Sequence, residues 1–376
     1  MSIKVATLQF EPTQFQKEKN VARLLELAEE AARGGAQLIV MPEMATTGYC
    51  WKNREEVRPY VETIDGVSTR AFTALAREFN CYLVYGMPEC DPLTDLFYNS
   101  AVLVGPEGVV GVHRKTHPYI SEPKWAANGD AGHQVFETKI GKIALLICMD
   151  IHFIETARLV AVGGAQVICH ISNWLAERTP APYWLTRGWE NGCALIESNR
   201  WGWERGVQFS GGSCIIDSQG ELLACCDSGD QILTAELVLP ETNPWLKKRR
   251  PELYQRLMTN TYLWNPKEYF GLYGCEPLPE GKNSRIAAAQ FYPQDSIDEN
   301  LHLIRKQIEQ AKVNGVELLV LPERALTGGE GSHNALPKDH PAIKSLISLA
   351  INFDIALLAG FAEYDGSNYY NSALLV

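Results

Sequence analysis

Two patterns of apolar residues, one typical of strands and one of helices, follow each other along the first part of the chain. Residues 3–10 and 37–41 are strand-like apolar runs, and residues 18–33 between them place apolar side chains at helical spacing before two glycines. Residues 68–80 and 82–86 repeat the helical and the strand-like pattern. This strand–helix–strand order predicts an α/β protein with helices packed on the outer face of a sheet.

A strong turn sequence at residues 105–108 separates apolar runs at 97–104 and 109–113, which predicts a β-hairpin. Residues 143–149 form a continuous apolar run that ends at an acid, which is typical of a strand buried on both faces. A helix is expected at 154–162. Further strands are expected at residues 166–171, 195–199, 213–217 and 232–237.

Reactive side chains stand at the ends of several of these predicted strands. Glu43 follows an early strand, Lys115 follows the hairpin, and Cys148 lies near the end of the run at 143–149. Each has an ordinary interpretation when taken alone: a solvated loop acid, an edge-strand lysine and a cysteine buried in the core. In α/β folds, however, nucleophiles and ligands gather at the carboxyl ends of strands, so the three residues together indicate one site.

The ordered set Glu43, Lys115 and Cys148 resembles the Glu-Lys-Cys triad of the nitrilase superfamily of carbon–nitrogen hydrolases. The resemblance covers roughly residues 3–258. It includes further motifs: Pro42-Glu43, Thr47-Gly48-Tyr49, Tyr98-Asn99-Ser100, Arg114-Lys115, Cys148-Met149-Asp150, Arg187 with Glu190-Asn191, Asn199, and Phe209-x-Gly211-Gly212-Ser213. It implies a four-layer α-β-β-α sandwich, with residues 1–258 as the catalytic domain, and a homo-oligomer in which such sandwiches join.

The resemblance also assigns roles to individual residues. Cys148 would be the nucleophile, Glu43 the general base, and Lys115 the cation that stabilises the thiolate and the oxyanion. Glu122 matches a second glutamate that many members place after the lysine, where it would help to position water; its alternative is an exposed loop acid. The residues expected to bind substrate are Tyr49, Met149, Asn173 and Trp174, although Trp174 fits a place in the core equally well.

These roles describe cysteine-dependent hydrolysis of a non-peptide carbon–nitrogen bond through a thioester, with release of ammonia and no requirement for a metal or organic cofactor. True nitrilases carry Cys-Trp-Glu at the nucleophile, whereas Cys148-Met149-Asp150 looks more like the amide and N-carbamoyl hydrolases of the superfamily. An amidase or carbamoylase that acts on a small-molecule amide is therefore the favoured interpretation. Nitrile hydrolysis is the nearest alternative, and a catalytically silent scaffold of the same fold is the alternative from another class.

The end of the chain repeats the pattern of its beginning. The matched segments are residues 5–12 with 286–293, 38–43 with 318–323, and 98–104 with 370–376. Glu323 is the counterpart of Glu43, but the repeat contains no counterpart of the lysine or the cysteine. We therefore expect a linker at 259–283 and a partial, non-catalytic repeat of the fold at 284–376. The alternative is that Glu323 completes a site with another subunit.

The composition of the chain limits the kinds of binding partner and the cellular compartment that we expect. The net charge of −11 and the sequence pI of about 5.3 argue against a nucleic-acid-binding surface, which is normally basic. No apolar stretch approaches the ~20 residues that span a membrane, and the chain begins with a strand pattern instead of a signal peptide. The ten cysteines are scattered without a zinc-binding Cys-x-x-Cys pattern, which favours reduced thiols and a cytoplasmic enzyme.

Overall fold

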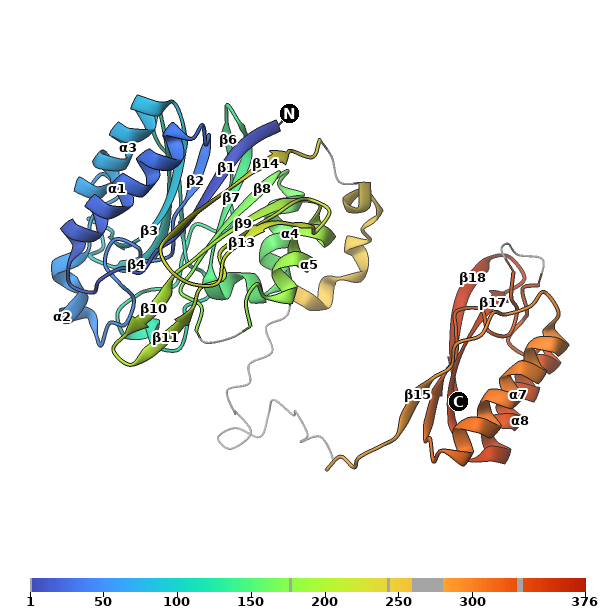
Figure 1. Ribbon diagram of the computed structural model, residues 1–376. Coiled ribbons are helices and arrows are strands. Elements are labelled where there is room, and N and C mark those ends of the chain that lie inside the picture. The colour runs from blue at the N-terminus through green and yellow to red at the C-terminus, as the bar shows by residue number, and fades with distance from the viewer. Residues whose placement is uncertain (1, 176–177, 242–243, 259–279, 330–333) are drawn as a thin grey trace. The chain divides into compact units, whose positions relative to one another are not determined.

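The computed structural model describes residues 2–175, 178–241, 244–258, 280–329 and 334–376. Residues 1–259 and 260–376 form two separate compact units (Figure 1). Each unit has its own sheets, helices and hydrophobic core. The predicted linker at 259–283 lies largely outside the described residues.

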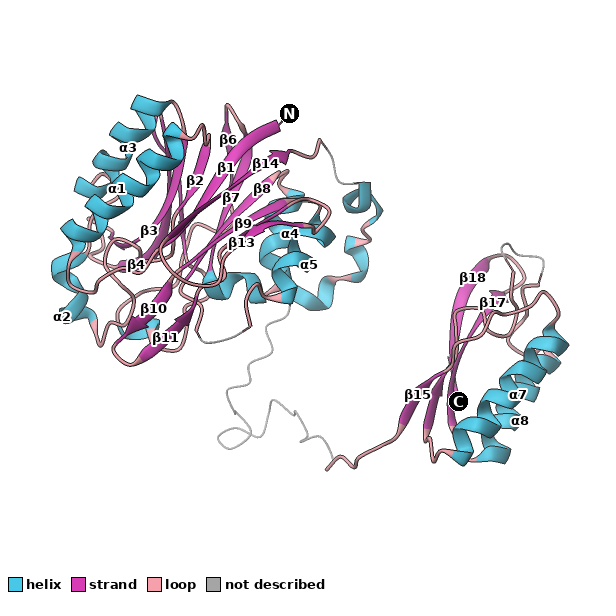
Figure 2. Cartoon of the chain, in the orientation of Figure 1, coloured by secondary structure: helices cyan, strands magenta, loops and turns pink. Residues whose placement is uncertain are grey.

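The first sheet of the first unit has the strand order β14-β1-β2-β3-β4-β5, in which β1, β2 and β3 run parallel and the other pairs are antiparallel. Its strands are β1 (Ser2–Gln9), β2 (Leu38–Val40), β3 (Tyr82–Cys90), β4 (Phe97–Gly105), β5 (Gly108–Arg114) and β14 (Gln231–Val238). Helices α1 (Lys17–Arg33) and α3 (Val67–Phe79) cover one face of this sheet (Figure 2). Their apolar stripes, which include Leu24 and Phe72, form the core on that side.

The second sheet of the first unit has the order β13-β12-β9-β8-β7-β6. Its strands are β6 (Val135–Thr138), β7 (Gly141–Ile147), β8 (Val167–Ser172), β9 (Ala194–Asn199), β12 (Cys214–Ile216) and β13 (Leu222–Cys225). Strands β7, β8 and β9 are parallel, and their near-continuous apolar sequences fit strands that are buried on both faces. Helices α4 (Ile154–Val162) and α5 (Pro182–Asn191) pack against this sheet.

The two sheets of the first unit share one core. Val40, Val84 and Leu103 of the first sheet belong to the same buried cluster as Leu145 and Ile168 of the second. Because α1 and α3 lie outside one sheet and α4 and α5 outside the other, the layers run α-β-β-α, and the predicted four-layer sandwich is confirmed.

The second unit contains one four-stranded sheet, with the order β15-β16-β17-β18, and two helices. Its elements are β15 (Ile286–Ala288), α7 (Ile297–Val313), β16 (Leu318–Val320), α8 (Pro341–Phe353), β17 (Ala356–Tyr364) and β18 (Tyr369–Leu375). This order reproduces β1 to β4 with α1 and α3, so the predicted half-repeat of the fold is confirmed. The helices bury one face of the sheet, whereas Ile286 and Leu375 on the other face are 62% and 67% exposed.

Several short elements did not follow from the apolar pattern. They are the strands β6, β13, β10 (Trp201–Glu204) and β11 (Val207–Ser210), helix α2 (Arg54–Val57), and the 3-10 helices η1 (Arg58–Tyr60), η2 (Glu122–Lys124), η3 (Cys148–His152), η4 (Pro244–Lys248), η5 (Pro251–Leu253) and η6 (Gln255–Met258). Most are edge strands or single turns, whose sequences are too short and too polar to show a period. Across the described part of the chain, no helix combines the length and the apolar character needed to cross a membrane.

Candidate active site

Three elements from both sheets bring reactive side chains to one place. Glu43 follows β2 and Lys115 follows β5 in the first sheet, whereas Cys148 directly follows β7 in the second sheet and begins η3. The side chains are 0%, 1% and 7% exposed, so all three lie in the interior. The arrangement therefore joins the ends of strands from the two layers of the sandwich.

Lys115 lies between two buried carboxylates. Its Nζ donates hydrogen bonds to Glu43 Oε1 at 2.9 Å and to Glu122 Oε1 at 2.5 Å. Burial lowers the pKa of Lys115, but the charges of Glu122, Glu43 and Cys148 more than offset it and leave the pKa well above its usual range. Glu122 is fully buried in η2, so the alternative of an exposed loop acid is wrong.

Glu43 is held in a single orientation by donors from both sheets. Its Oε1 accepts a hydrogen bond from Asn99 Nδ2 at 2.6 Å, and its Oε2 accepts one from the Asn173 amide N–H at 2.6 Å. Burial raises the pKa of Glu43; the Lys115 charge opposes that effect, and the Glu122 charge adds to it. A carboxylate with a raised pKa is better suited to exchange protons near neutral pH.

Cys148 occupies a sharp turn between β7 and η3. Its φ angle is +44°, in the left-handed region that non-glycine residues rarely adopt, and such strain is common at functional sites. Its main-chain carbonyl accepts a hydrogen bond from His170 Nε2 at 3.0 Å, and His170 in turn pairs with Glu197. Arg187 Nε donates to the carbonyl of Ile151 in the same turn at 3.3 Å.

The surroundings of the Cys148 thiol favour its neutral form. Burial raises the pKa of Cys148 well above its usual range, and the charges of Glu43 and Glu122 add to this effect. The Lys115 charge lowers the pKa, but not enough to compensate. An attack by this sulfur would therefore require a base to take the thiol proton, and Glu43 is the carboxylate with the larger effect on the thiol pKa.

A cavity of about 120 Å³ opens onto the thiol. It is lined by Tyr49, Tyr119, Cys148, Met149, His152, Asn173, Trp174 and Leu175. The structure therefore places all the predicted substrate-binding residues around the predicted nucleophile. The sequence pattern did not single out Tyr119 and Leu175, which follow Lys115 and β8 along the chain. His152, the last residue of η3, also lines the cavity.

Some polar side chains that line the cavity have hydrogen-bond partners in the described structure, and others do not. Tyr49 donates its hydroxyl hydrogen to Glu122 Oε1 at 2.6 Å. The Trp174 ring stacks on His152 at 4.8 Å between centroids, so Trp174 forms both a wall of the cavity and part of the core. The Asn173 side chain is buried, and within the described structure neither its Oδ1 nor its Nδ2 has a hydrogen-bond partner. A buried amide without a partner is unusual, and Asn173 also lines the cavity.

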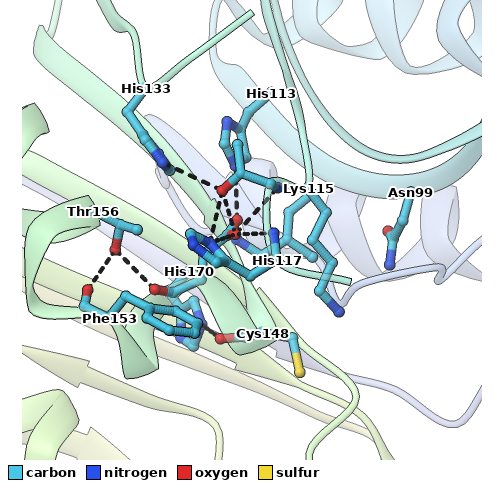
Figure 3. A network of polar contacts seen from close by, with 12 residues as sticks. Asn99, His113, Lys115, His117, His133, Cys148, Phe153, Thr156 and His170 are labelled. Carbon is cyan, nitrogen blue, oxygen red and sulfur yellow. Dashed lines mark hydrogen bonds and ion pairs between the residues drawn. The ribbon is translucent and has the colours of Figure 1, made fainter. Parts of the chain in front are cut away.

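Two contacts around the triad were missed at the level of sequence. Asn99 belongs to a motif of the resemblance, but only the fold shows that its amide bonds to Glu43. Asp150 was used to distinguish amidases from nitrilases, yet its carboxylate binds His113 and His117 on either side of Lys115. Figure 3 shows these two histidines with Lys115 and Cys148. The available signal was a pair of histidines spaced around the lysine, together with an acid placed two residues after the cysteine.

Comparison with known proteins identifies the family. The model of the carbon–nitrogen hydrolase family matches residues 4–247 and again residues 285–376. The chain therefore belongs to the carbon–nitrogen hydrolase family, and its second unit is a partial further copy of the same family's sequence. This confirms the resemblance to the nitrilase superfamily.

Individual relatives cover the first unit. A nitrilase from Pyrococcus abyssi is 36% identical over 264 residues, which make up 68% of this chain and 100% of the relative. An omega-amidase from Xenopus tropicalis is 30% identical over 63% of this chain and 92% of the relative. An amidase from Nesterenkonia sp. AN1 has a TM-score of 0.60 at 23% sequence identity, covering 68% of this chain and 97% of that one, which shows the common fold.

Proposed function

We propose that the first unit is an amidase or carbamoylase that hydrolyses a carbon–nitrogen bond through a thioester on Cys148 and releases ammonia. The observation that supports it best is the buried Lys115 ammonium, held between the carboxylates of Glu43 and Glu122 and acting electrostatically on a thiol that lines a cavity. Burying charged groups is costly, so a buried group of this kind at a cavity is typical of catalytic sites.

The proposed steps need one base. Glu43 takes the thiol proton while the sulfur attacks the amide carbon, and it gives that proton to the leaving nitrogen, so that ammonia departs and a thioester remains. Water then attacks the thioester and gives a proton to Glu43. When the tetrahedral species collapses, the acid is released and the sulfur recovers the proton. Glu122, which holds Lys115 and Tyr49, keeps the ammonium in place throughout.

Two donors are suited to stabilise the oxyanion. An ammonium has three N–H donors, and two of those on Lys115 point to Glu43 and Glu122, which leaves the third for a substrate oxygen. The main-chain N–H of Met149 lies in the first turn of η3, where N–H groups have no partner within the helix. Such donors are commonly worth about 3 kcal/mol in the transition state.

The cavity suits a short, uncharged acyl group. Its volume of about 120 Å³ lies well below the ~300 Å³ of pockets for drug-sized ligands. Among the described residues that line it, none is a lysine, arginine, aspartate or glutamate that could pair with a charged substrate. The amide of Asn173, which has no hydrogen-bond partner in the described structure, is our candidate to bind the carboxamide or ureido group of such a substrate.

Nitrile hydrolysis is the second candidate, because a relative at 36% identity is named a nitrilase. The turn Cys148-Met149-Asp150 favours the amide. A silent scaffold is the third, and the buried ion pairs of Lys115 argue against it, since they are costly to keep without a use.

The test is ammonia release from acetamide, butyramide, an N-carbamoyl amine, butyronitrile and succinamate, which is butyramide-sized but carries a carboxylate. We expect turnover of the short amides or the carbamoyl compound, at least about tenfold less with succinamate, and none in Cys148→Ala. Turnover of butyronitrile alone would contradict the amidase assignment. Failure across the panel, with no fast-alkylating thiol at Cys148, would favour the scaffold.

The setting of this activity is also part of the proposal. We place the enzyme in the cytoplasm as a homo-oligomer, and we assign no chemistry to the second unit. The nine described cysteines are all free thiols, which supports a reducing compartment. Residues 284–376 contain no cysteine, which supports a non-catalytic second unit.

A further inference from the structure

One buried carboxylate connects the two sides of the candidate site. Asp150, in η3, accepts hydrogen bonds from residues before and after Lys115. Figure 3 labels His113 and His117, which provide two of these contacts, together with Lys115. Asp150 Oδ2 faces His113 Nε2 at 2.8 Å and the Ile147 N–H at 3.1 Å. Its Oδ1 faces the Thr116 N–H at 3.2 Å, Thr116 Oγ1 at 2.8 Å, the His117 N–H at 3.0 Å and His117 Nδ1 at 3.0 Å.

These contacts keep Asp150 ionised inside the protein. Burial raises its pKa, but the hydrogen bonds from His113, His117 and Thr116 outweigh burial and bring the pKa well below its usual range. Further groups surround Asp150 and its partners. His133 Nε2 lies 3.3 Å from Thr116 Oγ1, Phe153 stacks on His117, and Thr156 Oγ1 donates to the Asp150 carbonyl. Burial lowers the pKa of His170, and the charge of Asp150 is among the effects that raise it. Burial lowers the pKa of His133 to about 4, so this histidine is neutral at physiological pH.

The positions of these donors matter more than their number. Lys115 lies at the end of β5 in the first sheet, and Cys148 lies at the end of β7 in the second. The main chain of Lys115 is fixed within the first layer: its N–H donates to Asn99 O in β4 at 2.8 Å, and its carbonyl accepts from Gly129 N at 2.8 Å. Asp150, two residues after Cys148, forms hydrogen bonds with residues on both sides of Lys115 and so connects the two layers.

We infer that Asp150 is a positioning residue that sets the place of the Lys115 ammonium relative to the Cys148 sulfur. It touches neither the cavity nor the reacting atoms, and it acts by tying the lysine segment of one sheet to the nucleophile turn of the other. The inference rests on the proposed function for its effect on turnover, but not for its effect on the thiol.

The thiol provides a separate readout because Lys115 lowers the pKa of Cys148. If the ammonium moves away, thiolate becomes harder to form, and alkylation of Cys148 slows at any pH below the thiol pKa. A purely structural role would lower the amount of folded protein, but it would leave the pH dependence of alkylation unchanged in the molecules that remain folded.

The experiment compares Asp150→Asn with wild type in the full chain, using iodoacetamide alkylation of Cys148 from pH 6 to pH 10 and turnover of the active amide. We expect alkylation at pH 8 to slow by about tenfold, and kcat to fall by about 100-fold with KM within about threefold, since a misplaced group costs rate more than binding. Asp130→Asn is the matched control: Asp130 is an exposed acid that pairs with Arg114, the neighbour of Lys115, and its change should alter neither quantity.

A second variant guards against loss of folding. Thr116→Ala removes one side-chain bond to Asp150 and should shift alkylation in the same direction by a smaller factor. A folded Asp150→Asn protein with the wild-type alkylation profile would overturn the inference. If Asp150→Asn does not fold, an unchanged profile in folded Thr116→Ala would overturn it. If wild type turns over no substrate, the proposed function fails, while the alkylation comparison still decides the role of Asp150.

Discussion

The first sheet of the first unit and the sheet of the second unit are built on one local plan. Asn20 and Asn300 each bind the main chain of two loops through their buried amides. Asn99 donates to Glu43, and its counterpart Asn371 donates to Glu323. In both units, therefore, an asparagine amide donates a hydrogen bond to the equivalent glutamate at the end of the equivalent strand.

What differs is what β5, the loop after it and the second sheet supply in the first unit. Glu43 is fully buried, pairs with Lys115 and accepts the Asn173 N–H from β8's loop, whereas Glu323 is exposed and forms no ion pair in the described part of its unit. Burial is the main cause of the raised pKa of Glu43. The same strand-end carboxylate thus has a raised pKa only in the first unit, where burial removes water from it, and the proposed role as base depends on that burial.

The largest expected effect comes from the two matched glutamates. Glu43→Gln should lower kcat for the active amide by about 10³-fold or more, because the only proposed base is lost. Glu323→Gln should leave kcat within about twofold of wild type. Steady-state ammonia release measures both. Loss of activity in Glu323→Gln would show that the second unit takes part in the chemistry.

The two sheet faces can be compared through matched leucines. Leu103 is fully buried between the two sheets of the first unit, and its counterpart Leu375 is 67% exposed. Leu103→Ala should cost about 2–5 kcal/mol in the free energy of unfolding, whereas Leu375→Ala should change it by less than about 0.5 kcal/mol. Urea unfolding followed by circular dichroism, with loss of activity marking the first unit, gives both values. A large cost for Leu375→Ala would mean that its face is covered in solution.

The matched asparagines test the support of the base. Asn99→Ala removes a 2.6 Å hydrogen bond to a buried carboxylate and should lower kcat by about 10- to 100-fold, which corresponds to about 1.5–3 kcal/mol for a charged hydrogen bond. Asn371→Ala should have no effect on turnover. The comparison uses the same assay at one pH, with circular dichroism to confirm folding, and equal effects of the two variants would contradict the account.

The smallest effect is a displacement of the acid limb of the pH profile. Glu43 accepts a proton only when it is ionised, so activity should be lost as pH falls through its pKa, which burial raises above 4.5. The pKa of Lys115 lies well above 10.5, so no loss from this group is expected until strongly alkaline pH. A profile of kcat/KM against pH checks this, and an acid limb at or below pH 4.5 would argue that Glu43 is not the base.

Much of the fold could be predicted from the sequence, because the apolar residues of the main strands and helices in both units recur with clear strand or helix periods. The helix at 154–162 and the α/β order are examples, and the repeat was visible because the same apolar runs return with the same Pro-Glu ending. The short strands β10 and β11 were missed, since four-residue strands with polar partners have no recognisable period. Their pairing depends on contacts within the folded unit.

The candidate site likewise has features that could be predicted from the sequence and features that could not. Glu43, Lys115 and Cys148 could be selected because they stand at strand ends in a familiar order, and the structure brings them together; their roles stay predictions. The burial of Glu122 was beyond reach, because a loop without periodicity gives no sign of folding inward. The bonds of Asp150 were equally hidden, since they join strand ends from different sheets, and spacing along the chain does not encode that distance.

The most direct test of the central claim is the intact mass of the protein, quenched in acid within milliseconds of mixing with a turned-over amide. The account predicts that a fraction of the protein gains the mass of the substrate minus ammonia. Peptide mapping should place the added acyl group on Cys148, and Cys148→Ala should show none. Turnover without an adduct under conditions that trap thioesters, or an adduct on another cysteine, would contradict the claim that Cys148 of the first unit carries the reaction.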